Sequence, residues 1–592
     1  MEWYRQVQFV SAVAMPPEDE AAFGTTVNGM WADPERTAAQ EVVRAHELGR
    51  RVLFSVPMIA LTPSFYEASP ALLDEVCIDV GGEPSECAWY YWESKPVYAA
   101  CIYSRTFRDY LLERCRLGVD RGMDVVNLDE IMTSIGLMDR DPGGCGFCFR
   151  CLERFRTNVP DAGLSADDDE ARAALAADED LYGRYRAFQE EEAFRVMVGF
   201  IQELRAYADE HNPGFAISAN VAYLGDLVRT FGALWGCLWG RHVDFILMEN
   251  HYRVEPGSPH LVLPRGSFAA WYRLGTSLTN APIWICPSIT VPRQMRDERR
   301  TNYYELMFLE AYANAGRWGY YWWPGVDHRT RLAATAPDAL KDHIRFIRDH
   351  RELYEDAEPD NDVAIVYVDG PISGQLGAHQ RYLALAQALI ERGVQFDVVY
   401  VGDGRFNPDE PDAQALGGYR TLLVPEARGL GQAPAAALEA FARGGGTVTA
   451  YSEHALDPGL VRRAEGGLLD DFWRTYRDDD RDAIVASAGA PASAVIESSN
   501  PAVVVTRYRL GDRIVLHVLN LGYDQGSDTV TPARDERLRI PWEGASASAA
   551  LLDLSGEHEM TVKNEDGALV LEIPELTMYG VLVIAPDAAR QT

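Results

Sequence analysis

The sequence predicts an α/β fold in three parts: a (β/α)8 TIM barrel, a doubly wound parallel α/β domain and a small antiparallel β domain. Three observations lead to this prediction. Up to about residue 355, eight apolar runs alternate with amphipathic helical runs. From about 361, near-continuous apolar strands alternate with helices, which is typical of a parallel sheet covered on both faces. Beyond about 490 the helical runs stop, and short alternating strands with turn residues follow.

The predicted barrel strands are apolar runs. They occupy about 6–13, 51–58, 96–103, 123–130, 214–221, 243–250, 282–289 and 316–323. The predicted helices lie at about 36–48, 105–121, 180–210, 225–236, 266–278, 299–315 and 337–353. The long stretches after the second and fourth of these strands fit catalytic loops, which a barrel carries on its C-terminal face.

The remaining segments give the predicted domain boundaries. A polar, proline-containing segment at 355–361 is expected to be a hinge. The barrel is therefore expected over 1–355, the doubly wound domain over 361–480 and a C-terminal β-sandwich over 490–592. Within the barrel, the acidic stretch 165–182 is expected to be a solvated helix.

The charge balance excludes several classes of partner. With 89 acidic and 55 basic residues, the formal net charge is −34. Such a field repels nucleic acid and anionic membrane surfaces, whereas neutral substrates meet no such barrier. The sequence contains no run of about 18 apolar residues, so it predicts no membrane span. The N-terminal segment lacks the pattern of a secretion signal, so a cytoplasmic protein is expected.

Three of the nine cysteines predict a metal site. Cys145, Cys148 and Cys151 are separated by two residues each, a spacing that suits a metal in a reducing compartment better than disulfides. A structural zinc site needs four ligands in a tetrahedron, so the fourth must come from elsewhere. A partial site with Cys115 or Cys87, or no metal at all, remains the alternative. Three other thiols are expected to be small buried hydrophobes: Cys77, Cys237 and Cys286.

Three segments, 101–115, 145–155 and 419–453, resemble the family-42 β-galactosidases and their relatives. The resemblance implies a barrel, an amidotransferase-like trimerisation domain and a small β domain. In the middle domain no cysteine follows TLLVP, where an active amidotransferase carries its nucleophile, so this domain is expected to be scaffolding in a homo-oligomer, with a trimer favoured. The resemblance also implies that Cys101 is the fourth zinc ligand.

The acids at the predicted strand ends are the candidate catalytic residues. Glycoside hydrolysis needs two carboxyl groups on either side of the scissile bond, and a barrel places them at the C-terminal ends of its strands. Strand four ends in Asp129 and Glu130, and strand six ends in Glu249. Strand seven, from which family-42 enzymes take their nucleophile, offers no acid. A pair on strands four and six instead resembles α-glycosidases that have an Asp nucleophile on strand four.

These positions suggest roles. Asp129 is the expected nucleophile, Glu130 its rival, and Glu249 the expected acid/base, since it follows the apolar run VDFILM. The structural alternative for each acid is a helix cap or a salt bridge at a strand end. Aromatic and polar side chains near the predicted strand ends could bind the sugar: Trp31, Trp92, Asn220, His251, Tyr252, Trp322 and Trp323.

The sequence therefore predicts a glycoside hydrolase, with a retaining mechanism favoured, that acts on a small oligosaccharide or glycoside. A non-catalytic carbohydrate-binding or assembly protein, or a sugar lyase on the same scaffold, is the alternative. Two pocket carboxyl groups about 5–10 Å apart favour hydrolysis. Aromatic side chains with a single acid favour binding.

Overall fold

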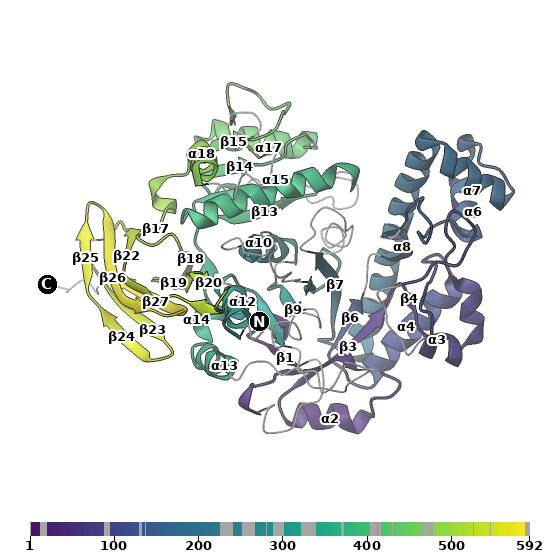
Figure 1. Ribbon diagram of the computed structural model, residues 1–592, viewed down its shortest axis with the longest axis horizontal. Coiled ribbons are helices and arrows are strands. Elements are labelled where there is room, and N and C mark those ends of the chain that lie inside the picture. Colours follow the sequence, from purple (N-terminus) through teal and green to yellow (C-terminus); the bar gives the residue numbers. More distant parts are fainter. Residues whose placement is uncertain are drawn as a thin grey trace.

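The structure is a computed structural model. It describes residues 2–11, 21–32, 34–87, 95–129, 133–136, 138–224, 241–251, 267–279, 281–287, 301–320, 339–368, 372–402, 411, 416–428, 430–464, 468–469, 478–524, 526–544 and 546–586. Only the backbone is described at 11, 30–32, 133, 136, 221–224, 249–251, 267–268, 286–287, 318–320, 372–377 and 478–479. Figure 1 shows a central barrel, an α/β unit above it, a β-rich unit on one side and a helical arm on the other.

Eight parallel strands form a closed barrel in the spatial order β1-β10-β9-β8-β7-β6-β3-β2. Their bounds are β1 (Phe9–Ser11), β2 (Val27–Ala32), β3 (Arg51–Pro57), β6 (Val125–Asp129), β7 (Ala216–Leu224), β8 (Phe245–His251), β9 (Trp284–Pro287) and β10 (Arg317–Tyr320). The barrel interior is filled by side chains from alternate positions of these strands, among them Val125, Phe245, Leu247 and Trp284. The rings of Phe245 and Trp284 stack with their centroids 4.3 Å apart.

One predicted strand was wrong and one was missed. The segment 96–103 is not in the barrel, because β5 (Tyr98–Ala99) pairs antiparallel with β4 (Ala60–Leu61) in a separate two-stranded sheet. The second barrel strand is instead β2, whose pairing with β3 shifts register between Asn28 and Ala32. Gly29, at φ +89°, interrupts this irregular strand. The strand therefore lacks the continuous apolar run by which a buried strand is recognised in a sequence.

Most helices lie within a few residues of their predicted bounds. They are α2 (Ala39–Glu47), α4 (Arg105–Asp120), α8 (Glu179–His211), α10 (Ser267–Thr279), α12 (Thr301–Ala313) and α13 (Leu340–Asp349). Ser104 caps α4 by accepting a hydrogen bond from the Phe107 amide at 2.9 Å. The predicted helix 225–236 lies outside the described residues, so the complete (β/α)8 repeat is not described.

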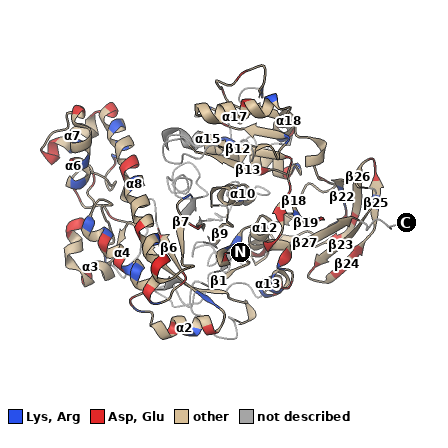
Figure 2. Cartoon of the chain, turned by 180° about the vertical axis from the view of Figure 1, so that it is seen from behind, with Lys and Arg blue, Asp and Glu red and all other residues tan. Residues whose placement is uncertain are grey.

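The arm in Figure 1 is an insertion after β6, and it contains α6 (Phe149–Asn158), α7 (Asp168–Ala177) and the first turns of α8. The predicted acidic helix corresponds to α7, which Asp167 caps through the amides of Asp169 and Glu170. Figure 2 shows acidic residues spread over the arm and the β-rich unit, with Lys and Arg among them. In the part of the chain that the structure describes, no helix is long and apolar enough to cross a membrane.

The unit above the barrel contains a five-stranded parallel sheet in the order β13-β12-β14-β15-β16. Its strands are β12 (Val363–Val368), β13 (Asp397–Val401), β14 (Thr421–Val424), β15 (Thr447–Ala450) and β16 (Arg462–Arg463). Its helices are α15 (Ile372–Glu391), α17 (Gln432–Arg443) and α18 (Asp478–Ala488). The Tyr382 hydroxyl of α15 donates to the Ala270 carbonyl of α10 at 2.5 Å and so ties this unit to the barrel.

The β-rich C-terminal part contains two larger antiparallel sheets and a short two-stranded sheet of β20 (Tyr523–Asp524) and β21 (Thr529–Val530). The six-stranded sheet has the order β11-β18-β19-β27-β23-β24 and the four-stranded sheet has the order β17-β22-β26-β25. Their bounds are β11 (Glu358–Pro359), β17 (Glu497–Ser498), β18 (Val503–Leu510), β19 (Arg513–Asn520), β22 (Ala533–Pro541), β23 (Ala547–Asp553), β24 (Gly556–Met560), β25 (Val562–Glu565), β26 (Ala568–Leu576) and β27 (Tyr579–Pro586). The mixed α/β fold and the β-rich C-terminus predicted from the sequence are confirmed.

The prediction of a hinge at 355–361 was wrong in one respect, because residues 358–359 form the strand β11. β11 pairs with β18 at the edge of the six-stranded sheet. Asp360 then accepts two hydrogen bonds from the Arg509 guanidinium, at 3.1 and 2.8 Å. A carboxylate held in this bidentate way anchors the connection to the C-terminal sheet.

Candidate functional site

Asp129 is the last residue of β6 and lies at the C-terminal end of the barrel. It pairs in register with Pro57 of β3, and its side chain is only 2% exposed. Asn127, two residues earlier, lies on the same face because strand side chains alternate. Asn127 donates to the Ser55 hydroxyl at 3.1 Å and accepts from the Ser218 hydroxyl at 3.2 Å. These contacts across three neighbouring strands form a polar layer directly beneath Asp129.

Asn220 of β7 contacts Asp129 directly. Its side-chain Nδ2 donates to Asp129 Oδ1 at 2.5 Å, and Asn220 is itself 7% exposed. The Oδ1 atom of Asn220 is buried and has no hydrogen-bond partner among the described residues. The sequence predicted Asn220 to bind sugar, whereas the structure shows its amide nitrogen on the predicted nucleophile. The amide therefore fixes the orientation of one carboxylate oxygen.

Glu249 is placed by its backbone register alone. Asn220 pairs with Leu247 and Ala222 pairs with Glu249. Leu247 belongs to the core inside the barrel, so Glu249, two residues later, has the same parity at the C-terminal end of β8. This register puts Asp129, Asn220 and Glu249 on the inner face of three consecutive strands. The side chain of Glu249 is not among those described.

The other predicted site residues are not located by the structure. Trp31 and His251 are described by their backbones, in β2 and β8. The rest lie outside the described residues: Glu130, Trp92, Tyr252, Trp322 and Trp323. Of the predicted catalytic and sugar-binding side chains, the structure therefore brings together Asp129 and Asn220.

A second candidate site is a buried cluster of thiols. Cys148 is the N-cap residue of α6, and Cys151 lies in the first turn of that helix. Cys101 lies shortly before Arg105, the first residue of α4. The Sγ atoms of Cys148 and Cys101 are 3.4 Å apart, those of Cys148 and Cys151 3.6 Å, and those of Cys101 and Cys151 3.8 Å. All three residues are at most 1% exposed.

These distances fit a tetrahedral metal site. With sulfur about 2.3 Å from zinc, the edge of a regular sulfur tetrahedron is about 3.8 Å. Three edges of 3.4–3.8 Å therefore give one face of that tetrahedron without further movement of the chain. A set of thiol donors alone suits zinc or another thiophilic metal. The residues present thus fit the metal that the sequence predicted.

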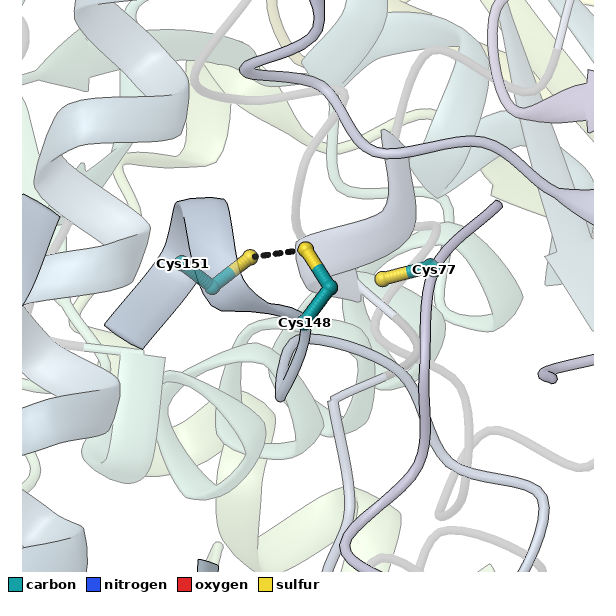
Figure 3. A group of neighbouring side chains, drawn as sticks. All are labelled: Cys77, Cys148 and Cys151. Atoms are coloured by element: carbon teal, nitrogen blue, oxygen red, sulfur yellow. Dashed lines mark hydrogen bonds between the residues drawn. The ribbon is translucent and has the colours of Figure 1, made fainter. Parts of the chain in front are cut away.

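Cys77 is buried as predicted, and it also belongs to this cluster, which the sequence did not predict. Its Sγ lies with those of Cys148 and Cys151 in a group whose members are all within 4.8 Å of one another. Figure 3 shows the three sulfur atoms facing one another, from α6 and from the segment before β5. No spacing in the sequence relates residue 77 to residue 148, because tertiary contacts alone bring them together.

The thiols interact strongly with one another. Hydrogen bonds with the other thiols, first of all Cys101, lower the pKa of Cys77 well below its usual range. The hydrogen bond with Cys148 and burial raise the pKa of Cys101. Cys115, a predicted alternative ligand, differs, since burial raises its pKa to about 12 and its charged neighbours are Arg114 and Arg116. Cys115 therefore behaves as an isolated buried thiol.

Comparisons with known proteins concern the whole chain. No family model matches it, and neither does any curated protein. The fold is similar to α-L-fucosidase isoenzyme 2 from Paenibacillus thiaminolyticus, with a TM-score of 0.63 and 14% identity over 99% of this chain and 100% of that chain. It is also similar to a β-galactosidase from Bacillus circulans sp. alkalophilus, with a TM-score of 0.59 and 13% identity over 96% and 99%.

A third similar structure is a catalytic mutant of a GH42 β-galactosidase from G. stearothermophilus, with a TM-score of 0.58 and 13% identity over 98% of this chain and 99% of that one. At such identities the likeness concerns the fold. Over nearly its whole length, the chain thus has the fold of these structures.

Proposed function

We propose that this protein is a glycoside hydrolase whose nucleophile is Asp129. The observation that carries the proposal is a buried carboxylate at the C-terminal end of the fourth barrel strand, oriented by the Asn220 amide. In a barrel, catalytic groups come from the C-terminal strand ends. The glycosidase scaffold supports the same reading, because solved structures with this fold are named as a fucosidase and β-galactosidases.

In the proposed mechanism Asp129 attacks the anomeric carbon and Glu249 protonates the leaving oxygen. Water then hydrolyses the glycosyl ester with Glu249 as base, so that configuration is retained. The inner-face register of both residues supports this pairing. Glu130 remains the rival nucleophile. We also propose that the barrel completes the (β/α)8 repeat.

A screen of aryl glycosides followed by NMR of the first-formed anomer tests this function. We expect release of the aryl group from at least one α- or β-glycoside, with the product anomer equal to that of the substrate. A product of opposite configuration would refute a retaining mechanism. An unsaturated product would identify a sugar lyase instead. Saccharide binding without turnover would favour the non-catalytic alternative.

We further propose that the thiol cluster holds a structural zinc ion. The ligands predicted from the sequence are Cys145, Cys148 and Cys151, with Cys101 as the fourth. Cys77 is a further candidate, because its Sγ lies near those of Cys148 and Cys151. Bound zinc supplies no open coordination position there, so it acts on stability and not on the chemical step. The ion would join the insertion after β3 to the insertion after β6, beside the proposed catalytic strand.

The assembly and location are proposals as well. We propose a homo-oligomer, with a trimer favoured, in which the unit containing β12–β16 is scaffolding. After β14, where an active amidotransferase carries its nucleophilic cysteine, this chain has Pro425 and Glu426. The Glu426 carboxylate accepts hydrogen bonds from Arg428 and Arg381. Light scattering that finds a monomer at micromolar concentration would refute the oligomer. A cytoplasmic location agrees with the thiols of Cys77, Cys101 and Cys148, which form no disulfide.

A further inference from the structure

We infer that the cleft between the unit containing β12–β16 and the β-rich C-terminal part is a second, non-catalytic binding site, and that its ligand is a neutral saccharide. The cleft has a volume of about 700 Å³, within the range of about 300–1,000 Å³ that is usual for small-molecule sites. Figure 1 shows β18 and β22, which contribute to its lining, on the side of the β-rich unit that faces the α/β unit. None of the described lining residues belongs to a barrel strand, so this inference does not require hydrolysis at Asp129.

One wall of the cleft is a fixed network that joins the two units. The guanidinium of the buried Arg507 donates to the Asp360 carbonyl at 2.7 Å and to the Ser493 carbonyl at 3.1 Å. The Asp360 carboxylate also accepts from Arg509, and the Ser493 hydroxyl donates to the Asp362 carboxylate. Because these groups already hold one another in place, little order has to be created when a ligand binds.

Other charged side chains of the lining are available to a ligand. Among the described residues, the Arg539 side chain of β22 donates only to the Asp566 carbonyl, at 3.4 Å. The carboxylates of Asp512 and Glu543 make no hydrogen bond or ion pair in the part of the chain that the structure describes. A guanidinium donates and carboxylates accept, so these side chains suit the hydroxyl groups of a sugar, which do both.

Trp542 gives the cleft an aromatic surface. It directly follows β22, and its amide donates to the Gly567 carbonyl at 3.0 Å. Gly544 packs against the edge of the indole, since a Cβ at residue 544 would lie only 2.4 Å from Nε1. Ile514 and Pro541 also line the cleft. A ring held in this way, together with these apolar side chains, offers a surface for the C–H face of a sugar ring.

The charges of the lining select the class of ligand. Four arginines and six acidic residues line the cleft. This mixture gives neither the positive field that favours a phosphate or sulfate group nor a purely anionic lining of the kind that favours a cation. Hydrogen-bond donors and acceptors around an aromatic ring instead suit a neutral molecule that is rich in hydroxyl groups.

The test measures amide hydrogen exchange of the full-length protein by mass spectrometry. The probes are lactose, maltose, cellobiose and sucrose, with a sulfated heparin disaccharide and spermidine as charged probes. At least one neutral disaccharide should slow exchange in segments 492–497 and 566–568, because both segments contribute to the lining. Slower exchange in 216–224 would report binding at the barrel, so the cleft and the proposed catalytic site are tested separately.

Variants connect this protection to the cleft. Arg539→Ala and Trp542→Ala should each weaken binding of the protecting disaccharide by about tenfold or more, since contacts of these kinds are lost. Arg534→Ala is the matched control, because Arg534 lies in the same strand, is exposed and pairs with Glu575 outside the cleft. This control should keep the dissociation constant within about twofold of the wild-type value.

No protection of the two cleft segments by any of the four neutral disaccharides would overturn the inference. Protection that is unchanged in both Arg539→Ala and Trp542→Ala would do so as well, and so would protection by a charged probe alone, which would identify an ion-binding site. Circular dichroism establishes that each variant is folded. Should Trp542→Ala not fold, Arg539→Ala decides alone.

Discussion

At the scale of single residues, the contact between Asp129 and Asn220 defines the candidate active site. Asn220 donates to one oxygen of the carboxylate at 2.5 Å, and the layer beneath is held by Asn127, Ser55 and Ser218. A nucleophile must present one oxygen to the anomeric carbon in a fixed direction. If Asp129 is the nucleophile, Asn220 is a positioning residue, and its replacement should affect turnover.

Replacing Asn220 by Ala should lower kcat by roughly tenfold to a hundredfold and change KM little. A hydrogen bond to a charged group contributes about 1.5–3 kcal/mol, which converts to that range of rates. Asn127→Ala is the matched control, because Asn127 lies one layer below and bonds to Ser55 and Ser218. Steady-state kinetics on an aryl glycoside separates the two parameters. A raised KM with unchanged kcat would return Asn220 to sugar binding.

At the scale of elements, regular periodicity decided what the sequence could predict. The described helices and seven of the eight predicted barrel strands lie close to their predicted positions, because their sequences are strongly periodic or apolar. Missing β2 and assigning 96–103 to the barrel offset each other, so that β6 is still the fourth strand and Asp129 still ends it. Segment 96–103 is apolar because it covers the thiol cluster and not because it is in the barrel.

The parts that the sequence could not predict depend on contacts between distant segments. Cys77 joins Cys148 across 71 positions, and β11 joins β18 across the expected hinge. The Asn220 amide meets Asp129 because β6 and β7 are neighbours in register, which follows from the barrel order. A motif search sees residue types and spacings, and none of these three contacts has a local spacing.

The helix α12 gives a prediction at this scale. Asp528, from the loop between β20 (Tyr523–Asp524) and β21 (Thr529–Val530), accepts from the Asn302 and Tyr303 amides at 3.2 Å each. It thereby caps α12 from another part of the chain. Asp528→Ala should lower the free energy of unfolding by about 1 kcal/mol, as loss of an N-cap does. Urea denaturation measures the change.

The control for this cap is Asp524→Ala in the same loop. Asp524 is exposed, and its carboxylate accepts hydrogen bonds within its own turn, from Ser527 and from the Gly526 amide. This control should leave the free energy of unfolding within about 0.5 kcal/mol of the wild type. Equal losses in the two variants would show that the capping contact adds nothing beyond local loop structure.

At the scale of the whole molecule, one continuous core joins the three parts. It contains Tyr312 of α12, Tyr382 of α15 and Val515 of β19. The six-stranded sheet is buried on both faces, since Val515 faces the barrel helices while Leu516 faces the four-stranded sheet. Because apolar surface is buried between the parts, their stabilities are coupled.

His517 makes this coupling sensitive to pH. It is buried where β19 meets the barrel, its Nδ1 lies 2.6 Å from the Tyr579 hydroxyl, and Tyr354 and Tyr508 pack around it. Burial lowers the pKa of His517 from 6.5 to about 3. The unfolded chain therefore takes up a proton near pH 6.5 while the folded protein does not until about pH 3. Stability must fall as the pH falls through this window.

Between pH 7.5 and 5.5, His517 alone should reduce the free energy of unfolding by about 1.4 kcal/mol. His517→Gln should be less stable at pH 7.5 but lose about 1.4 kcal/mol less on acidification. His558→Gln is the control, because His558 is exposed near Asp553. Urea unfolding at the two pH values measures the difference. An identical loss in wild type and His517→Gln would mean that His517 is not held neutral by the fold.

The role of Asp129 as nucleophile is tested by comparing two aspartates of the same barrel segment. Asp129→Asn removes the proposed nucleophile at the C-terminal end of β6. Asp124→Asn alters the residue before β6, where Asp124 bonds to His46 and Arg51 at the opposite end of the barrel. On an aryl glycoside that the wild-type protein hydrolyses, Asp129→Asn should lose at least about 10⁴ in kcat while Asp124→Asn keeps kcat within about threefold. Turnover by folded Asp129→Asn near the wild-type rate would show that Asp129 is not the nucleophile.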